Sequence, residues 1–332
     1  MTGRRLIVIG DNKVKFTLEL ERKVTILRGG SSTGKSHLYS LLEDSLQSKT
    51  RGVGVHCNCT SSIVVLSSTD WRKAVNLRNK IIFADEYEDA LFDREFLEAI
   101  STSDNYFVFI TRKANLLGVG FSVNSIFSLN VDAKEGDIFC THMRHMYNYK
   151  TTLPEGAPDI VITEDTNSGF RMFSDLVSRV SSIPVISAGG KDNIVNKLWK
   201  CKDEGFTHPY VIADGAAFGA RAQQIFSSDF GDNFKVELFV PESFEWMLLG
   251  TRIFTHDITT ELTETWDFCD AAKWTTWEQY FTDLTVSLSA RKGTSYSKSR
   301  LTSYFRTDAV KQDIAAMLYT LELCCYLQQE ED

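Results

Sequence analysis

Residues 24–36 read VTILRGGSSTGKS, and this stretch decides which fold the first half of the chain is expected to have. Its last eight residues fit the pattern GxxxxGK[ST], with Gly29, Gly34, Lys35 and Ser36 at the fixed positions. An apolar strand leads into the loop, and the residues after it, SHLYSLLEDSL, are typical of a helix. Backbone N–H groups at the amino end of such a helix would hold phosphate oxygens.

This loop predicts a site for a nucleoside triphosphate, expected to be ATP with Mg²⁺. Lys35 would reach the β and γ phosphates, and the hydroxyl of Ser36 would ligate Mg²⁺. The residues expected to bind the nucleotide are Gly29, Gly30, Ser31, Ser32, Thr33, Gly34, Lys35, Ser36 and His37. The alternative is a turn rich in glycine and serine that contains a lysine by chance.

A second motif favours the nucleotide site over the chance turn. Residues 80–86 read KIIFADE, an apolar strand that ends in two acids, and Asp85 follows Ser36 by 49 residues. This is the Walker B arrangement. Asp85 would hold Mg²⁺ through its water shell, and Glu86 would polarise the water that attacks the terminal phosphate. The two motifs together predict a hydrolase.

The next apolar run, YFVFITR at 106–112, is expected to lie beside the strand that ends at Asp85. Its polar end would then place Thr111 where it could sense the γ phosphate, which makes Thr111 a candidate catalytic residue. The alternative is an ordinary buried strand with a capping threonine.

Length and punctuation indicate more than one domain. A chain of 332 residues exceeds the size at which one hydrophobic core usually stops growing. The segment LPEGAPD at 153–159 is the expected boundary, because all five prolines lie after residue 153. We therefore expect a nucleotide-binding α/β domain over 1–152, a second parallel α/β domain over 153–270, and a helical extension over 271–332 packed on the second domain.

Charge and composition narrow the function classes. Residues 1–150 carry 20 Lys and Arg against 17 Asp and Glu, whereas the remainder carries 16 against 27. The acidic second half argues against a broad electrostatic footprint for nucleic acid, although a local basic stripe could coexist with it. No apolar run is long enough to span a membrane. The seven cysteines lack regular spacing, so a cytoplasmic protein with reduced thiols is expected.

Acids in the second half follow predicted strands. Strands and helices alternate from 160 to 249, which predicts a parallel sheet whose carboxyl edge gathers the residues after each strand. The candidate ligands for Mg²⁺ or Mn²⁺ at this edge are Glu164, Asp165, Asp214, Glu242 and Glu245. The alternative is helix capping, since Asp214 and Glu242 also lie where a helix begins.

The strongest basic stretch, 291–306, contains no acid and interleaves Tyr296, Tyr304 and Phe305 with its cations. Such a segment could contact a phosphate backbone, and Lys298 could stabilise charge on a phosphoryl transition state. The alternative is a solvated loop.

The first half resembles the ABC and AAA-like P-loop ATPases in its motifs GGSSTGKS and KIIFADE. It has no LSGGQ-like signature, which argues against a transporter mechanism. The second half resembles the TOPRIM domain of OLD-type ATPase-nucleases and related bacterial defence proteins, through Glu164, SAGGKDN at 187–193, Asp214 and PESFEWML at 241–248.

The TOPRIM resemblance implies that Glu164, Asp214 and Glu245 bind metal and that Lys298 assists phosphoryl transfer. Two departures matter: Asp214-Gly-Ala lacks a second aspartate, and Ser168 stands where an acid is expected. A single-metal site or a non-cleaving domain therefore stays open.

Two functions follow from these patterns. The first is an ATP-hydrolysing protein of bacterial or phage defence whose second domain cleaves nucleic acid with a metal. The second is a nucleotide-switched regulatory or binding module that cuts nothing. The partners expected are a nucleoside triphosphate, a nucleic acid, and a protein partner or a second copy of the chain, with no membrane.

Overall fold

The fold is mixed α/β and is known from a computed structural model, which describes residues 1–30, 33–46, 54–57, 63–85, 94–112, 120–147, 157–254, 257–290 and 295–318. Contacts divide the chain into two compact units. The first unit comprises residues 1–147 together with 264–276, and the second comprises 148–263 together with 277–332. The segment 264–276, which spans the domain boundary expected at residue 270, thus lies wholly with the first unit.

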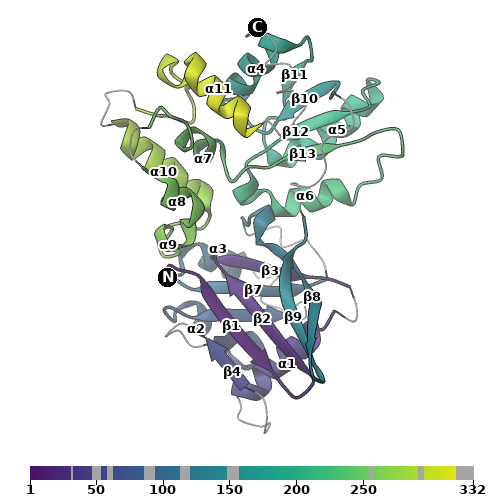
Figure 1. Cartoon of the computed structure of the whole chain (residues 1–332), viewed down its shortest axis with the longest axis vertical. Coiled ribbons are helices and arrows are strands. Elements are labelled where there is room, and N and C mark those ends of the chain that lie inside the picture. The colour runs from purple at the N-terminus through teal and green to yellow at the C-terminus, as the bar shows by residue number, and fades with distance from the viewer. Residues whose placement is uncertain are drawn as a thin grey trace. The chain divides into compact units, whose positions relative to one another are not determined.

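Among the described residues of the first unit, nine strands form one sheet in the order β4-β1-β2-β9-β8-β3-β7-β6-β5 (Figure 1). The strands are β1 (Arg5–Gly10), β2 (Val14–Leu20), β3 (Val24–Arg28), β4 (Gly54–Cys57), β5 (Ile63–Val65), β6 (Ile81–Asp85), β7 (Tyr106–Thr111), β8 (Ile126–Glu135) and β9 (Ile138–His145). The run β8-β3-β7-β6-β5 is parallel throughout, whereas β1 pairs antiparallel with β2 and β4, and β8 pairs antiparallel with β9.

Helices pack against both faces of strand β7, which is apolar on both faces. The helices are α1 (Lys35–Leu46), α2 (Trp71–Val75), α3 (Arg94–Thr102) and α9 (Thr265–Phe268), with 3₁₀ turns η1 (Leu66–Ser68) and η3 (Val123–Ser125). Along β7, Val108 and Ile110 join the core that contains Leu38 and Leu42 of α1. The alternate residues Phe107 and Phe109 pack on Phe96 of α3. Every residue of β7 is buried, as expected for a strand covered on both faces.

Segment 264–276 is held to the first unit by hydrogen bonds from three places. Gly3 N donates to Trp266 O at 2.7 Å, and Lys23 Nζ donates to Ala271 O at 2.8 Å. Thr275 Oγ1 donates to Ser101 O, which also accepts from Lys23. Since Lys23 immediately precedes β3, segment 264–276 lies at the end of the sheet where β3 begins.

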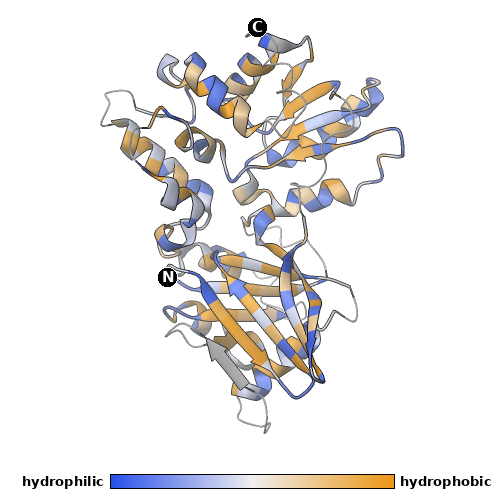
Figure 2. Cartoon of the chain, viewed as in Figure 1, coloured by the Kyte–Doolittle hydropathy of each residue, from blue (hydrophilic) through white to orange (hydrophobic). Residues whose placement is uncertain are grey.

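The described strands of the second unit form a parallel sheet in the order β11-β10-β12-β13, as expected from the alternating pattern. They are β10 (Ile160–Thr163), β11 (Val185–Ser187), β12 (Pro209–Ile212) and β13 (Glu237–Phe239). The two central strands, β10 and β12, are fully buried and mainly hydrophobic (Figure 2). The carboxyl ends of all four strands therefore lie at one edge of this sheet.

The helices of the second unit are α4 (Ser168–Val180), α5 (Ile194–Asp203), α6 (Gly219–Phe226), α7 (Phe244–Leu249), α8 (Thr259–Thr263), α10 (Trp277–Ala290) and α11 (Asp308–Met317). The 3₁₀ turns are η4 (Lys191–Asn193), η5 (Gly215–Ala217) and η6 (Ser303–Arg306). Helix α10 packs on α7, and α11 packs on α4 and α7. Among all described residues, no helix has the length and apolar character needed to cross a bilayer.

Candidate functional site

The glycine loop connects β3 to α1, as its sequence predicts. Gly34 has φ = +82°, in the left-handed region where a side chain is strained, so glycine is required there. Leu38 N donates to Gly34 O at 2.9 Å, which starts the hydrogen bonding of α1 directly after the loop. Ser31 and Ser32 lie outside the described residues.

Lys35 is buried, and its ammonium is enclosed by the loop itself. Its Nζ donates to Gly29 O at 2.6 Å, to Gly30 O at 2.9 Å and to Thr33 Oγ1 at 2.7 Å. A Cβ at Gly29 would lie 3.0 Å from the Thr33 side chain and 3.4 Å from Lys35 Nζ. The absence of a side chain at Gly29 thus leaves the room in which the ammonium sits.

Two other candidate residues lie at the same edge of the sheet as the loop. The register pairs Arg28, at the end of β3, with Thr111 of β7, and Ile110 of β7 with Asp85 of β6. The expected adjacency of β7 and β6 is confirmed. Because parallel strands end on one edge, the glycine loop, Thr111 and Asp85 share that edge. Glu86 lies outside the described residues.

Ser36 and His37 are exposed in the first turn of α1. The ring nitrogen Nε2 of His37 lies 3.2 Å from Asp11 Oδ2 in the β1–β2 turn. Partial burial raises the pKa of Asp11, but hydrogen bonds from the backbone of Lys13 and Val14 lower it more, so that the pKa lies below its usual value. Asp11 is a neighbour of the loop that the sequence patterns did not indicate.

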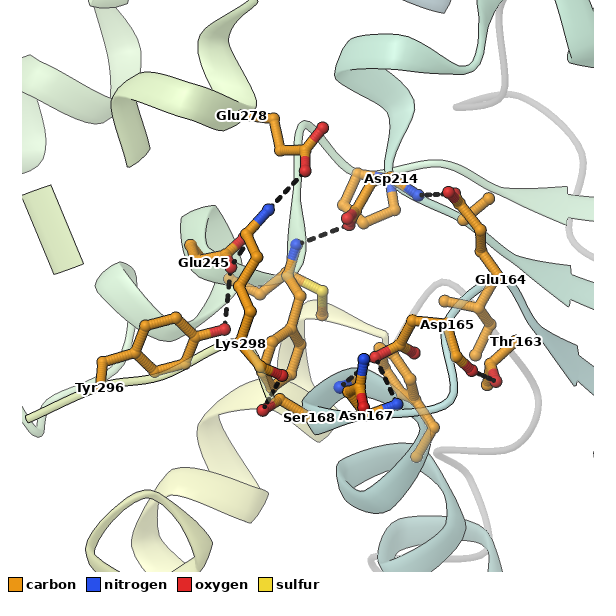
Figure 3. A pocket seen from close by; sticks show the side chains of 17 residues that line it. Thr163, Glu164, Asp165, Asn167, Ser168, Asp214, Glu245, Glu278, Tyr296 and Lys298 are labelled. Atoms are coloured by element: carbon orange, nitrogen blue, oxygen red, sulfur yellow. Dashed lines mark hydrogen bonds and ion pairs between the residues drawn. The ribbon is translucent and has the colours of Figure 1, made fainter. Parts of the chain in front are cut away.

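The second unit contains a cavity of about 210 Å³ at the carboxyl ends of β10 and β12 (Figure 3). Its lining includes six charged side chains and one tyrosine. They are Glu164, Asp165, Asp214, Glu245, Glu278, Tyr296 and Lys298. Four of the five predicted acids and the predicted lysine therefore line one cavity. Glu242 is not among the described residues that line it, although its carbonyl accepts a hydrogen bond from Ala216 N.

Glu164 and Asp214 are linked directly. Asp214 N donates to Glu164 Oε2 at 3.0 Å, and Asp214 Oδ1 accepts from Phe244 N at 2.9 Å. Burial raises the pKa of Glu164 to about 7. Burial, followed by the charges of Glu245 and Glu278, raises the pKa of Asp214 well above its usual value. These two carboxyl groups therefore favour a proton or a cation near them.

Glu245, in the first turn of α7, is 2% exposed. Its Oε1 accepts from the Tyr296 hydroxyl at 2.8 Å, whereas its Oε2 is buried without a hydrogen-bond partner among the residues described. Burial raises the pKa of Glu245, although the ammonium of Lys298 opposes this. A buried carboxylate oxygen without a donor is a position that a cation would satisfy.

Lys298 brings the positive charge of the cavity. Its Nζ lies 3.7 Å from Glu245 Oε1 and forms an ion pair with Glu278 Oε1 (Figure 3). Burial lowers the pKa of Lys298, but the carboxylates of Glu245 and Glu278 outweigh this and raise it. Glu278 was missed by the sequence patterns, because it lies in a helix far from any predicted strand end.

Asp165 has the helix-capping role that the sequence patterns offered for Asp214 and Glu242. Its carboxylate accepts from Asn167 N at 3.0 Å, Gly169 N at 3.1 Å and Phe170 N at 2.8 Å, at the start of α4. Its backbone carbonyl accepts from the side chains of Thr163 and Ser187. These bonds fix Asp165 as part of the frame of the cavity.

The carboxylates have the hard oxygen donors that Mg²⁺ and Mn²⁺ prefer. In the described parts of the chain, however, no group of three or more His, Cys, Asp or Glu is placed so that it could hold a metal ion. Glu164, Asp214 and Glu245 thus share a cavity without forming a ready coordination site. A metal would have to draw these side chains closer together.

Comparison of the sequence with protein-family models and with curated proteins, and of the structure with solved structures, finds no match.

Proposed function

We propose that the first unit binds ATP with Mg²⁺ and hydrolyses it. The observation that carries this proposal is the common sheet edge on which the glycine loop, Thr111 and Asp85 lie. The resemblance of GGSSTGKS and KIIFADE to the motifs of P-loop ATPases supports the same conclusion.

The residues present fit a bound triphosphate. Lys35 would exchange its contacts with Gly29 O and Gly30 O for phosphate oxygens, and the N–H groups at the start of α1 would face the same anion. Ser36 and Asp85 would hold Mg²⁺, which supplies charge neutralisation on the phosphates when bound. Glu86 would orient the attacking water, and Thr111 would contact the terminal phosphate.

Removal of the Lys35 ammonium tests this proposal. We expect Lys35→Met to weaken ATP binding, measured by calorimetry with Mg²⁺, by about 100-fold or more, because a charge-assisted bond to phosphate is lost. Lys73→Met is the matched control, since Lys73 is exposed on α2 of the same unit, and it should leave the affinity unchanged. Equal affinities of wild type and Lys35→Met would reject the site. GTP measured in parallel decides the base preference.

For the second unit we propose metal-dependent cleavage of a phosphodiester. The gathering of Glu164, Asp214, Glu245 and Lys298 around one cavity supports this function. The first three would hold Mg²⁺ or Mn²⁺, which supplies Lewis-acid polarisation of a phosphate when bound. Lys298 would stabilise the negative charge that develops on the phosphate oxygens.

The alternative is a regulatory or binding domain that cuts nothing. It is favoured by the lack of a ready metal group among the described residues and by the capping role of Asp165. Incubation with plasmid DNA and with structured RNA, with Mg²⁺ or Mn²⁺ and with or without ATP, separates the two functions. Cleavage that disappears in Glu164→Ala supports the nuclease. Intact substrates under all of these conditions favour the regulatory domain.

A further inference from the structure

The backbone around Lys298 is fixed at several points, whereas its side chain is long and reaches an open cavity. Ser168 Oγ donates to the carbonyl oxygens of Ser297 and Lys298, at 3.2 Å and 2.9 Å. Tyr296 N donates to Ser289 Oγ at 2.8 Å, and the Tyr296 hydroxyl donates to Glu245. The position of the Lys298 Cα is therefore set, but these bonds do not fix its ammonium.

Two carboxylates hold the tip of this side chain. The contact with Glu245 Oε1 is long, at 3.7 Å, and Glu245 already accepts the Tyr296 hydroxyl. The contact with Glu278 is a short, direct ion pair. Since the Lys298 side chain is 46% exposed, one long contact would not hold it in a single place. Glu278 is thus the group that defines where the ammonium lies.

The backbone of Glu278 belongs to a packed helix. Glu278 is the second residue of α10, whose Phe281 and Thr285 are fully buried and which packs on α7, the helix that carries Glu245. Helix α10 therefore presents Glu278 from a fixed frame on the side of Lys298 away from Glu245 (Figure 3). Among the described residues that line the cavity, Lys298 is the only lysine or arginine.

We propose that Glu278 is a positioning residue of this cavity, which holds the Lys298 ammonium beside Glu245 where it can receive a phosphate group of a phosphodiester. This inference rests on the proposed function of the second unit. In it, Glu278 acts through Lys298 and makes no bond to metal or substrate.

The test measures, by nitrogen-15 NMR on the full chain, how fast the protons of the lysine ammonium groups exchange with water. This exchange is slower for an ammonium group that is engaged in an ion pair. The Lys298 signal is assigned by its loss in Lys298→Met. We expect Glu278→Gln to speed its proton exchange about threefold, the size of a partly exposed ion pair, and Glu278→Asp to restore part of the effect. Asp283→Asn, at an exposed position of the same helix, is the control and should change nothing. Unchanged exchange in Glu278→Gln would overturn the proposal.

A second measurement separates positioning from metal binding. If wild type cleaves a phosphodiester with Mn²⁺, Glu278→Gln should lower kcat about tenfold with little change in KM. The loss should vanish when Lys298 is already Met, because Glu278 acts through it. A further loss in that background makes Glu278 a direct ligand and refutes the positioning role. If wild type cleaves nothing, the proposed nuclease falls, while the exchange rates still decide the role of Glu278.

Discussion

The two candidate sites both lie at the carboxyl ends of parallel strands, but they are built in different ways. The site in the first unit is formed by one short loop between β3 and α1, in which the carbonyl groups of Gly29 and Gly30 accept from the Lys35 ammonium and Gly29 leaves room for it. The site in the second unit is formed by side chains that are far apart in the sequence, from Glu164 to Lys298. The first encloses a positive charge, and the second gathers negative charges. This difference agrees with the proposals of an anionic ligand at the first edge and of a cation at the second.

The largest effect is expected from a substitution in the core of α10, the helix that carries Glu278 in the second site. Phe281 of α10 is fully buried, so Phe281→Ala should lower the free energy of unfolding by about 3–5 kcal/mol. Val286→Ala, at a 41% exposed position of the same helix, should change it by less than about 0.5 kcal/mol.

Denaturant unfolding measures the stability of Phe281→Ala and Val286→Ala. Their ATP affinity is measured at denaturant concentrations below the unfolding transition. We expect Phe281→Ala to keep its ATP affinity, because the glycine loop belongs to the other compact unit. Equal stabilities of the two variants would mean that α10 is not the frame of the cavity.

Stability that depends on pH should mark the second site. The pKa of Glu164 is about 7 in the folded protein, against 4.5 for an ordinary glutamate, chiefly because of burial. Between these pH values the folded protein keeps a proton that the unfolded chain releases, so stability is present below about pH 4.5 and is lost as the pH rises to 7. Glu164 alone would account for about 3 kcal/mol.

The measurement is the free energy of unfolding at pH 5 and pH 8, for wild type and Glu164→Gln. In Glu164→Gln, the free energy of unfolding should decrease much less between pH 5 and pH 8 than in wild type. Glu204→Gln, at an exposed position, should behave as wild type. If wild type and Glu164→Gln show the same pH dependence, the pKa of Glu164 is not raised in the folded protein, and the second site does not differ from the first in this respect.

The smallest effect distinguishes a capping acid from a metal ligand. Asp165→Ala should destabilise the second unit by about 1 kcal/mol, because three backbone N–H groups at the start of α4 lose their acceptor. Mn²⁺ affinity, measured by calorimetry, should stay as in wild type. A variant that keeps its stability but loses Mn²⁺ binding would return Asp165 to the set of metal ligands.

Elements with strong local patterns could be predicted from the sequence. Helix α1 runs over Lys35–Leu46 as expected, and the short apolar runs form β6, β7, β10 and β12. The hairpin of β8 and β9 was not predicted, although Leu129, Val131 and Ala133 alternate with polar residues as in a strand, and the structure shows that the second half of β8 is exposed on both faces. Its place in the sheet comes from pairing with β3 and β2, which are distant in sequence.

The residues of the candidate sites also differ in whether a local sequence pattern predicts them. A loop of eight consecutive residues with two required glycines can be recognised from spacing alone. The acids at 164, 214 and 245 could be proposed because each follows a predicted strand. Glu278 could not, since only the packing of α10 on α7 brings it to Lys298. The partners of Asp165 at the start of α4 and of Asp214 at the start of α7 likewise depend on hydrogen bonds that no spacing reveals.

The return of residues 264–276 to the first unit has a practical consequence for dissecting the protein. A gene fragment that stops near residue 152 encodes the glycine loop and all nine described strands of that sheet, yet it omits the chain that accepts the ammonium of Lys23. This lysine is 4% exposed, so the truncated fragment would leave its buried ammonium with Ser101 O but without the second carbonyl acceptor, Ala271 O. A fragment meant to contain the whole first unit should therefore include 264–276, joined back through a linker.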